Sequence, residues 1–205
     1  MKNLEYYKSR LVASDSKYLG AYNHIVKNKP KFIVEYGGGK STYDLTELVN
    51  FLDYGGEIVG YECNSYWYND HIEKGWNKYN NIKLVDIIES TEFNTRGVRY
   101  IHPIEDIKEV DFVIIDGPDL RDFESDPGTT FNLMDIVNHL GYEIPYFIDG
   151  RTGTRDFYGN NTDHPHEFGL DYKTDIGDTK KIWRYLLNIV WNETTNQRLS
   201  VWEMI

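Results

Sequence analysis

Apolar residues along the chain alternate between short continuous runs and helical spacing, and this pattern indicates the fold. From residue 15 to 28 the apolar side chains recur every three or four positions, which predicts a helix. The run 31–36 is short and apolar, ends at three glycines, and predicts a buried strand. A helix is expected next, because the Ser41 and Thr42 hydroxyls suit its N-terminal cap. Its apolar face consists of Leu45, Leu48, Val49 and Leu52.

The alternation continues to residue 149. Further strands are predicted at 57–62, 82–88, 111–116 and 145–149, with helices over 65–79 and near 129–140 and a short extra strand at 98–102. Apolar strands separated by helices favour an α/β fold, with a Rossmann-like, doubly wound, mostly parallel sheet and helices on both faces. The end of the chain differs, because 181–191 and 198–205 flank a polar turn and predict a C-terminal antiparallel β-hairpin.

No repeat, low-complexity tract or linker divides the 205 residues, and we therefore interpret 1–205 as a single domain. Within it, residues 1–30 are expected to form an N-terminal helical region and residues 31–205 the core. A chain of this length can bury enough apolar surface to fold without cross-links. Its single cysteine, Cys63, excludes an intrachain disulfide and a cysteine-based zinc site.

The charge balance limits the partners. Lys and Arg total 22 against 33 Asp and Glu, which gives a formal net charge of −11. So acidic a chain repels phosphate backbones, and no nucleic-acid partner is expected. No apolar run approaches the ~20 residues that span a bilayer, and the first ten residues are too polar for a signal peptide. We therefore expect a cytoplasmic protein with no membrane partner.

The most informative segment is 34–42, VEYGGGKST, in which a strand end, three glycines and a helix start follow one another. Such a loop lets backbone approach a ligand at the positive end of a helix. A P-loop would need a glycine five positions before Gly39, where this chain has Val34, and Glu35 would face its phosphates. A dinucleotide-binding loop would need a third glycine where Thr42 stands. A nucleotide-binding enzyme is therefore the less favoured alternative.

The pattern Glu35-x-Gly37-x-Gly39-x-Ser41-Thr42 resembles motif I of class I S-adenosylmethionine-dependent methyltransferases. The chemistry agrees with this, because S-adenosylmethionine carries a sulfonium and an ammonium but no phosphate, so a carboxylate at the strand end attracts it. The resemblance also implies that Glu62, which ends the following strand, accepts both ribose hydroxyls. The cofactor-binding residues that it implies are Glu35, Gly37, Gly38, Gly39, Ser41, Thr42 and Glu62.

Residues 112–118 resemble the fourth-strand motif of the same family, and 146–151 resemble the fifth. Asp116 and Asp149 end these strands, and the resemblance implies that they are catalytic residues beside the methyl acceptor. In metal-dependent O-methyltransferases of this superfamily, acids at these places hold Mg²⁺. Asp116 and Asp149 are therefore also candidate metal ligands, although Gly150 stands where a third ligand usually follows.

The resemblance thus implies a methyltransferase that uses S-adenosylmethionine on a small-molecule or sugar hydroxyl, so a small-molecule or glycan substrate is expected. A catalytically inactive or S-adenosylmethionine-binding scaffold stays open, because the acceptor-side residues are less specific than the cofactor loop. Trp183, Trp191 and Trp202 lie on the predicted hairpin and suit either a core or a partner surface, which leaves a homodimer open. The Gly-, Asn- and Asp-rich loop 159–178 is interpreted as a lid or a mobile surface segment.

Overall fold

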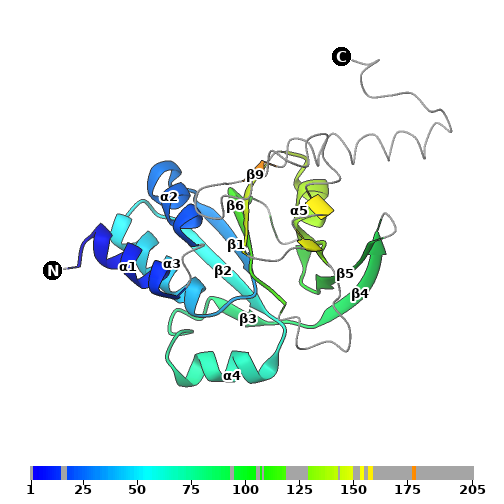
Figure 1. Cartoon of the computed structure of the whole chain (residues 1–205), viewed down its shortest axis with the longest axis horizontal. Coiled ribbons are helices and arrows are strands. Elements are labelled where there is room, and N and C mark those ends of the chain that lie inside the picture. The colour runs from blue at the N-terminus through cyan, green and yellow to red at the C-terminus, as the bar shows by residue number, and fades with distance from the viewer. Residues whose placement is uncertain are drawn as a thin grey trace, which may run out of the picture.

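The computed structural model describes residues 2–14, 18–92, 95–104, 107, 109–118, 129–142, 144–149, 153–154, 157–158 and 177–178. Its centre is a six-stranded sheet in the order β3-β2-β1-β6-β8-β9 (Figure 1). The strands are β1 Phe32–Tyr36, β2 Glu57–Glu62, β3 Ile82–Leu84, β6 Phe112–Ile115, β8 Pro145–Ile148 and β9 Gly177–Asp178. All neighbouring pairs are parallel except β8 with β9, which is antiparallel. The predicted mostly parallel, doubly wound sheet is confirmed.

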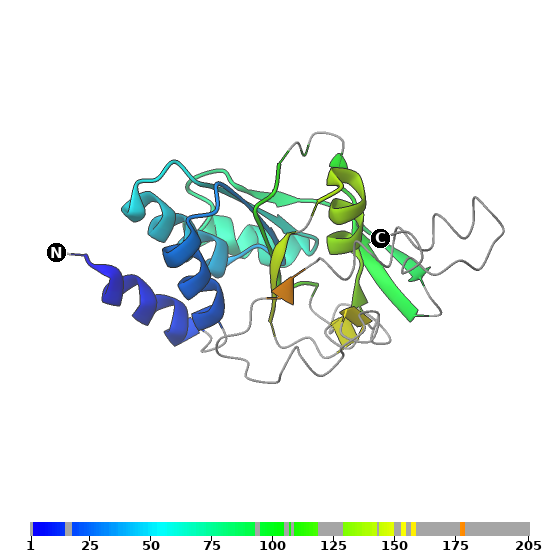
Figure 2. The same cartoon turned by 90° about the horizontal axis from the view of Figure 1, so that it is seen from above.

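Helices cover both faces of this sheet (Figures 1 and 2). Their bounds are α1 Leu4–Ser14, α2 Leu19–Asn28, α3 Lys40–Leu52, α4 Ser65–Glu73 and α5 Asn132–Leu140. On one face Ile33 of β1 packs in a cluster with Leu48 of α3, and helices α1 and α2 add to the same cluster. On the other face Val34 shares a cluster with Val137 of α5. Because successive residues of a strand point to opposite faces, a strand covered on both sides is apolar throughout.

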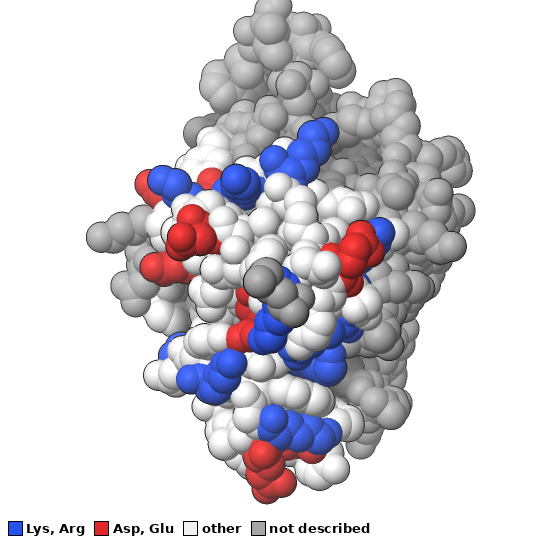
Figure 3. Space-filling model, turned by 90° about the vertical axis from the view of Figure 1, so that its left-hand side faces the viewer, with Lys and Arg blue, Asp and Glu red and all other residues white. Residues whose placement is uncertain are grey.

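Ion pairs hold α1 against α3. The carboxylate of Asp44 on α3 is buried and pairs with Arg10 of α1 and with Lys40. One turn further along α3, Glu47 pairs with Lys2 at 3.2 Å and Lys78 at 2.9 Å. Figure 3 looks onto this side, where basic and acidic side chains lie next to one another. The pairs made by Lys2 and Arg10 link the N-terminal segment and α1 to α3.

The chain also forms a second sheet of three strands, and one of the sequence predictions is wrong there. It contains β4 Ile87–Glu92, β5 Thr95–Tyr100 and β7 Thr129–Thr130, in the order β4-β5-β7. The prediction of one strand over 82–88 is wrong, because β3 ends at Leu84 and β4 pairs with β5 instead of β2. The change of partner occurs at Asp86, whose carbonyl accepts a hydrogen bond from the Ile101 amide. The short strand expected at 98–102 is the end of β5.

The other differences between the predicted and the observed elements concern the residues at which helices begin and end. Helix α4 stops at Glu73 and not at 79, because Gly75 adopts a φ of +72°. The helix predicted near 129–140 begins at Asn132, since residues 129–130 pair as β7. The predicted hairpin 181–191 and 198–205 lies outside the described residues, as does most of the loop 159–178. Within the described ranges, no helix combines the length and apolar character needed to cross a membrane.

Candidate functional site

The carboxyl ends of the parallel strands meet at one edge of the sheet, and the glycine loop 37–39 lies at its centre. There the strand order changes direction, because β2 and β6 flank β1 on opposite sides. Doubly wound sheets bind their ligands at this switch point. A cavity of about 410 Å³ opens at the loop. It is lined by Tyr18, Gly37, Gly38, Gly39, Lys40, Ser41, Glu62, Trp67, His71, Asp116, Gly117, Pro118 and Asp149. All the predicted site residues except Glu35 and Thr42 therefore line one cavity.

Gly37 starts the loop in a conformation that side chains rarely adopt, with a φ of +93°. Its amide donates a hydrogen bond to the Tyr61 carbonyl at 2.8 Å, which ties the loop to β2. A Cβ on Gly37 would lie only 2.4 Å from the amide nitrogen of Gly117, which follows β6. Both the backbone angle and the space available therefore require glycine at this position.

The next two glycines approach other elements. A Cβ on Gly38 would lie 2.9 Å from the Cα of Gly60 in β2. A Cβ on Gly39 would lie 2.9 Å from Nε2 of His71, which α4 supplies. The loop is therefore pressed between neighbours on three sides, and its position is set by packing as well as by hydrogen bonds.

Glu35 lies beneath the loop and is completely buried, so it does not line the cavity. Its carboxylate accepts hydrogen bonds from the hydroxyls of Tyr18 at 2.8 Å, Ser41 at 2.6 Å and Thr42. Burial raises the pKa of Glu35, whereas these hydrogen bonds lower it and the nearby charge of Asp149 raises it further. In this arrangement Glu35 anchors the start of α3 below the cavity.

The start of α3 differs from the sequence prediction. Ser41 and Thr42 were expected to cap the helix, but the N-cap residue is Gly39 and the helix begins at Lys40. Thr42 instead stands in the first turn, where its Oγ1 accepts the Gly39 amide at 2.9 Å and donates to Glu35. Both hydroxyls donate to the buried carboxylate of Glu35, and they do so from within the first turn of α3 and not from the N-cap position.

Glu62 ends β2 at the cavity wall and is largely buried. Its Oε1 accepts the backbone amides of Cys63 and Asn64, each at 2.8 Å, which orients the carboxylate. The Asn64 side chain in turn accepts the amide of Tyr66 at 2.8 Å and caps α4. The turn from β2 into α4 therefore holds Glu62 in one position.

Asp116 and Asp149 follow the neighbouring strands β6 and β8, as predicted, and both line the cavity. The Asp116 amide donates to the Tyr36 carbonyl at 2.7 Å, and the Asp149 amide donates to the Ile115 carbonyl at 2.8 Å. These hydrogen bonds extend the sheet by one residue on each strand. The two carboxylates are thus positioned by the ends of the strands and not by a separate loop.

The described residues do not meet the donor set of a metal site. Among them no group of three or more His, Cys, Asp or Glu side chains is placed to hold a metal ion. Asp116 and Asp149 share the cavity wall with Glu62 and His71, but in the part of the chain described these side chains are not grouped so that three of them could hold one metal ion. The Mg²⁺ alternative therefore gains no support from this geometry.

Tyr18 and His71 are two of the wall residues that sequence reasoning did not assign to the site. Tyr18, the residue before α2, places its hydroxyl 2.8 Å from Glu35 Oε1 and 2.9 Å from Asp116 Oδ2. His71 of α4 lies against Gly39, and its Nδ1 is buried. Neither residue belongs to a local motif, because both reach the loop from distant parts of the sequence. An aromatic residue on an apolar helical face was the only available signal for Tyr18.

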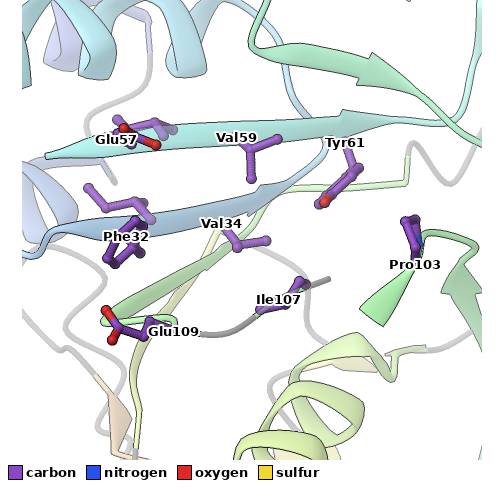
Figure 4. A pocket seen from close by; sticks show the side chains of 10 residues that line it. Phe32, Val34, Glu57, Val59, Tyr61, Pro103, Ile107 and Glu109 are labelled. Carbon is purple, nitrogen blue, oxygen red and sulfur yellow. The ribbon is translucent and has the colours of Figure 1, made fainter. Parts of the chain in front are cut away.

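A second cavity lies along the strands, away from the loop (Figure 4). It measures about 690 Å³ and is mostly apolar. It is lined by Phe32, Ile33, Val34, Glu57, Ile58, Val59, Tyr61, Pro103, Ile107 and Glu109. Val34, Val59 and Tyr61 belong to the face opposite α3, and the described residues between β3 and β6 contain no α-helix to cover it. The two cavities have no lining residue in common.

No family model matches this sequence, and no curated protein sequence matches it. Solved structures that resemble it include the plantazolicin methyltransferase BpumL in complex with SAH, at a TM-score of 0.36 and 16% identity over 71% of this chain and 49% of that chain. Another is cmcI-N160 with SAH, at a TM-score of 0.35 and 16% identity over 72% of this chain and 61% of that chain. A SAM dependent methyltransferase from Aquifex aeolicus resembles it at a TM-score of 0.36 and 12% identity over 72% of each chain. The chain spans about half the length of the first and three fifths of the second. With TM-scores below 0.5, these likenesses are partial and do not identify the chain's function.

Proposed function

We propose that this chain is an S-adenosylmethionine-dependent methyltransferase acting on a small-molecule or sugar hydroxyl. The observation that carries the proposal is the set of carboxylates around the glycine loop. Glu62, Asp116 and Asp149 line its cavity, and Glu35 lies directly beneath. Such a site attracts a ligand with sulfonium and ammonium groups and repels a triphosphate. The resemblance of residues 35–42 to motif I supports the same ligand.

Each wall of the cavity has a distinct task in this proposal. The loop 37–39 lets the ligand approach the backbone closely, since no side chain stands in the way. Glu62, whose Oε1 is held by backbone amides, accepts hydrogen bonds from the ribose hydroxyls. When bound, the cofactor supplies the methyl group on a positively charged sulfur. Asp116 and Asp149 face that charge and the incoming acceptor.

Methyl transfer to a hydroxyl is an in-line displacement and needs two contributions from the chain. The first is alignment of the acceptor oxygen with the methyl group, which positioning by a rigid wall provides. The second is removal of the hydroxyl proton, for which a carboxylate at the wall is a suitable base. Asp116 is our candidate base because it lines the cavity and its carboxylate is connected to Tyr18 and Glu35.

The position of the apolar cavity favours one alternative, a scaffold that binds S-adenosylmethionine without turnover. An acceptor pocket would adjoin the loop, but the cavity of Figure 4 shares no lining residue with it. A scaffold and an enzyme predict the same cofactor binding. They differ in whether the bound cofactor is consumed when small-molecule and sugar hydroxyls are offered.

Calorimetric titration tests the cofactor assignment directly. S-adenosylmethionine and S-adenosylhomocysteine are expected to bind, whereas ATP with Mg²⁺ and NAD are not. Glu62→Gln should lower the affinity for both adenosyl ligands about tenfold, because one hydrogen bond to a charged group contributes about 1.5 kcal/mol or more. The matched control is Glu57→Gln, at the other end of the same strand and outside the loop cavity. Unchanged affinity in Glu62→Gln would contradict the ribose assignment, and binding of ATP alone would contradict the proposed function.

A further inference from the structure

His71 stands in the cavity wall with no role in the mechanism proposed above. The residue is 8% exposed, and its ring packs against Trp76 with the centroids 5.4 Å apart. Its Nδ1 is buried, and none of the described residues forms a hydrogen bond with it. An imidazole buried in this way loses its hydrogen bonds to water and is destabilising unless something else replaces them. Because Nδ1 is buried, a ligand in the cavity that His71 lines could contact this ring only through its other nitrogen, Nε2.

The ring presents its other nitrogen to the loop. Nε2 is the ring atom nearest to Gly39, 2.9 Å from the place that a Cβ would occupy. The ring and the loop line the same cavity. The tautomer that carries its proton on Nε2 therefore places a hydrogen-bond donor at the start of α3.

Burial favours the neutral form of the His71 ring. Burial lowers the pKa of His71, Asp70 raises it and Lys74 lowers it again. Asp70 lies 3.9 Å from Nδ1, but its carboxylate is paired with Lys74 at 2.7 Å. Glu62 lies on the wall of the same cavity. A neutral ring carries no fixed positive charge and has one N–H, which is a donor to the cavity in the tautomer protonated at Nε2.

One part of the cavity wall, formed by the start of α3 and His71, offers hydrogen-bond donors, whereas Asp116 and Asp149 form an acidic part. The thirteen-residue helix α3 begins at Lys40, and the N-terminus of a helix is positively polarised. The Lys40 ammonium itself is paired with Asp44. The Nε2–H of His71 therefore adds to the helix end as a donor for an oxygen of the ligand, while Asp116 and Asp149 attract positive groups. This division suits a ligand that carries both charges.

We propose that His71 donates a hydrogen bond through Nε2 to the carboxylate of the amino-acid part of the cofactor, beside the N-terminus of α3. The inference rests on the proposed function, since it assigns one more contact in the same site. It makes His71 a binding residue that selects ligands with an intact amino-acid moiety. It also explains why Gly39 has no side chain, because one would displace the ring from this position.

The test compares two ligands that differ only in the group in question. S-adenosylhomocysteine contains the amino-acid moiety, whereas 5′-methylthioadenosine keeps the adenosine and the sulfur but lacks it. In His71→Leu, the affinity for S-adenosylhomocysteine should fall about 10-fold or more, while that for 5′-methylthioadenosine should change less than about 2-fold. His71→Gln, which keeps a neutral donor near the Nε2 position, should recover most of the lost affinity.

His24→Gln is the matched control. His24 on α2 is also partly buried and stacks on Phe112, but it does not line the cavity. It should leave the affinities for both ligands unchanged, and thermal unfolding of each variant separates a folding defect from a loss of binding. Equal losses for the two ligands in His71→Leu, or no loss for either, would overturn the inference alone. Failure of the wild-type chain to bind either ligand would overturn the proposed function and, with it, this inference.

Discussion

The hydroxyl of Tyr18 lies 2.8 Å from Oε1 of Glu35, which joins the start of α2 to the buried end of β1. The same hydroxyl lies 2.9 Å from Oδ2 of Asp116. A phenol has one proton, so the two carboxylates share a single donor. The N-terminal region therefore does more than cover the sheet, because the residue before α2 supplies a group to the wall of the candidate site.

Tyr18→Phe should destabilise the chain more at high pH than at low pH. Burial raises the pKa of Glu35 in the folded state, and its hydrogen bonds, Tyr18's among them, lower it. A carboxyl with a raised folded pKa gives stability below its ordinary pKa and loses it as the pH rises through the folded pKa. Without the Tyr18 hydroxyl that pKa rises further, so the variant should lose about 1–2 kcal/mol at pH 8 and less at pH 5.

Urea unfolding at the two pH values measures this difference. Tyr22→Phe is the control, because Tyr22 lies in the helix that follows Tyr18 and its hydroxyl donates to the Leu4 carbonyl and not to Glu35. Its loss of stability should be the same at pH 5 and pH 8. An equal loss at both values in Tyr18→Phe would show that the hydroxyl does not favour the ionised form of Glu35.

Gly37→Ala should be far more disruptive than Gly55→Ala. Both glycines have a positive φ, +93° at Gly37 and +77° at Gly55. A Cβ on Gly55 meets nothing within 4 Å, so only the strained backbone angle costs stability, about 1 kcal/mol. A Cβ on Gly37 would collide with Gly117, and the total loss should be about 3 kcal/mol or more.

Chemical denaturation measures the loss of stability in each glycine variant, and calorimetry with S-adenosylhomocysteine measures the effect on binding. Gly37→Ala should abolish measurable binding, because the backbone at the switch point must move to admit the methyl group. Gly55→Ala should bind like the wild type. If the two variants were equally stable, the close approach of Gly37 and Gly117 would not be a feature of the folded chain.

Glu47→Gln should remove part of the acid sensitivity of the fold. Burial opposes ionisation of Glu47, but hydrogen bonds from Tyr79, Lys78 and Lys2 outweigh it and lower its pKa to about 2. A carboxyl with a lowered folded pKa stabilises the fold above its ordinary pKa, and this contribution disappears as the pH falls towards the folded value. Because the lysines are partly exposed and screened, the contribution should be about 1 kcal/mol.

The measurement is the free energy of unfolding between pH 6 and pH 2. The wild type should be more stable than Glu47→Gln at pH 6, and the two curves should converge near pH 2. Glu5→Gln provides the comparison, since Glu5 is exposed on α1 and lies 4.0 Å from Lys8. Parallel curves for wild type and Glu47→Gln would contradict the assignment of the lowered pKa.

Local patterns were sufficient to predict the strands β1, β2, β6 and β8 of the central sheet, although they did not predict the end of β3 or the strand β9. A strand buried on both faces is apolar throughout, and this property lies in the strand itself, as Ile33 and Val34 illustrate by joining opposite clusters. The ligand edge was predictable for the same reason. Asp116 and Asp149 directly follow apolar runs, and parallel strands bring their carboxyl ends together.

The features that were missed depend on contacts between distant residues. The chain leaves the central sheet at Asp86 because its carbonyl pairs with Ile101, and no residue near 86 signals that partner. Tyr18 reaches Asp116 across 98 positions of sequence. His71 matters only because Gly39 lies against it. Composition and periodicity do not contain such pairings, since they arise when the elements pack.

Gly37, Gly117 and the hydroxyl of Tyr100 pack closely against one another on one side of the glycine loop. A Cβ on Gly117 would lie 2.0 Å from the Tyr100 hydroxyl and 2.5 Å from the Cα of Gly37. Backbone held this tightly has already lost its conformational freedom when the chain folds, so little entropy remains to be lost when a ligand arrives. The site is preorganised, and slow closure around a ligand is not needed at this wall. Positions 37, 100 and 117 should accordingly vary together and not singly among sequences that keep this arrangement.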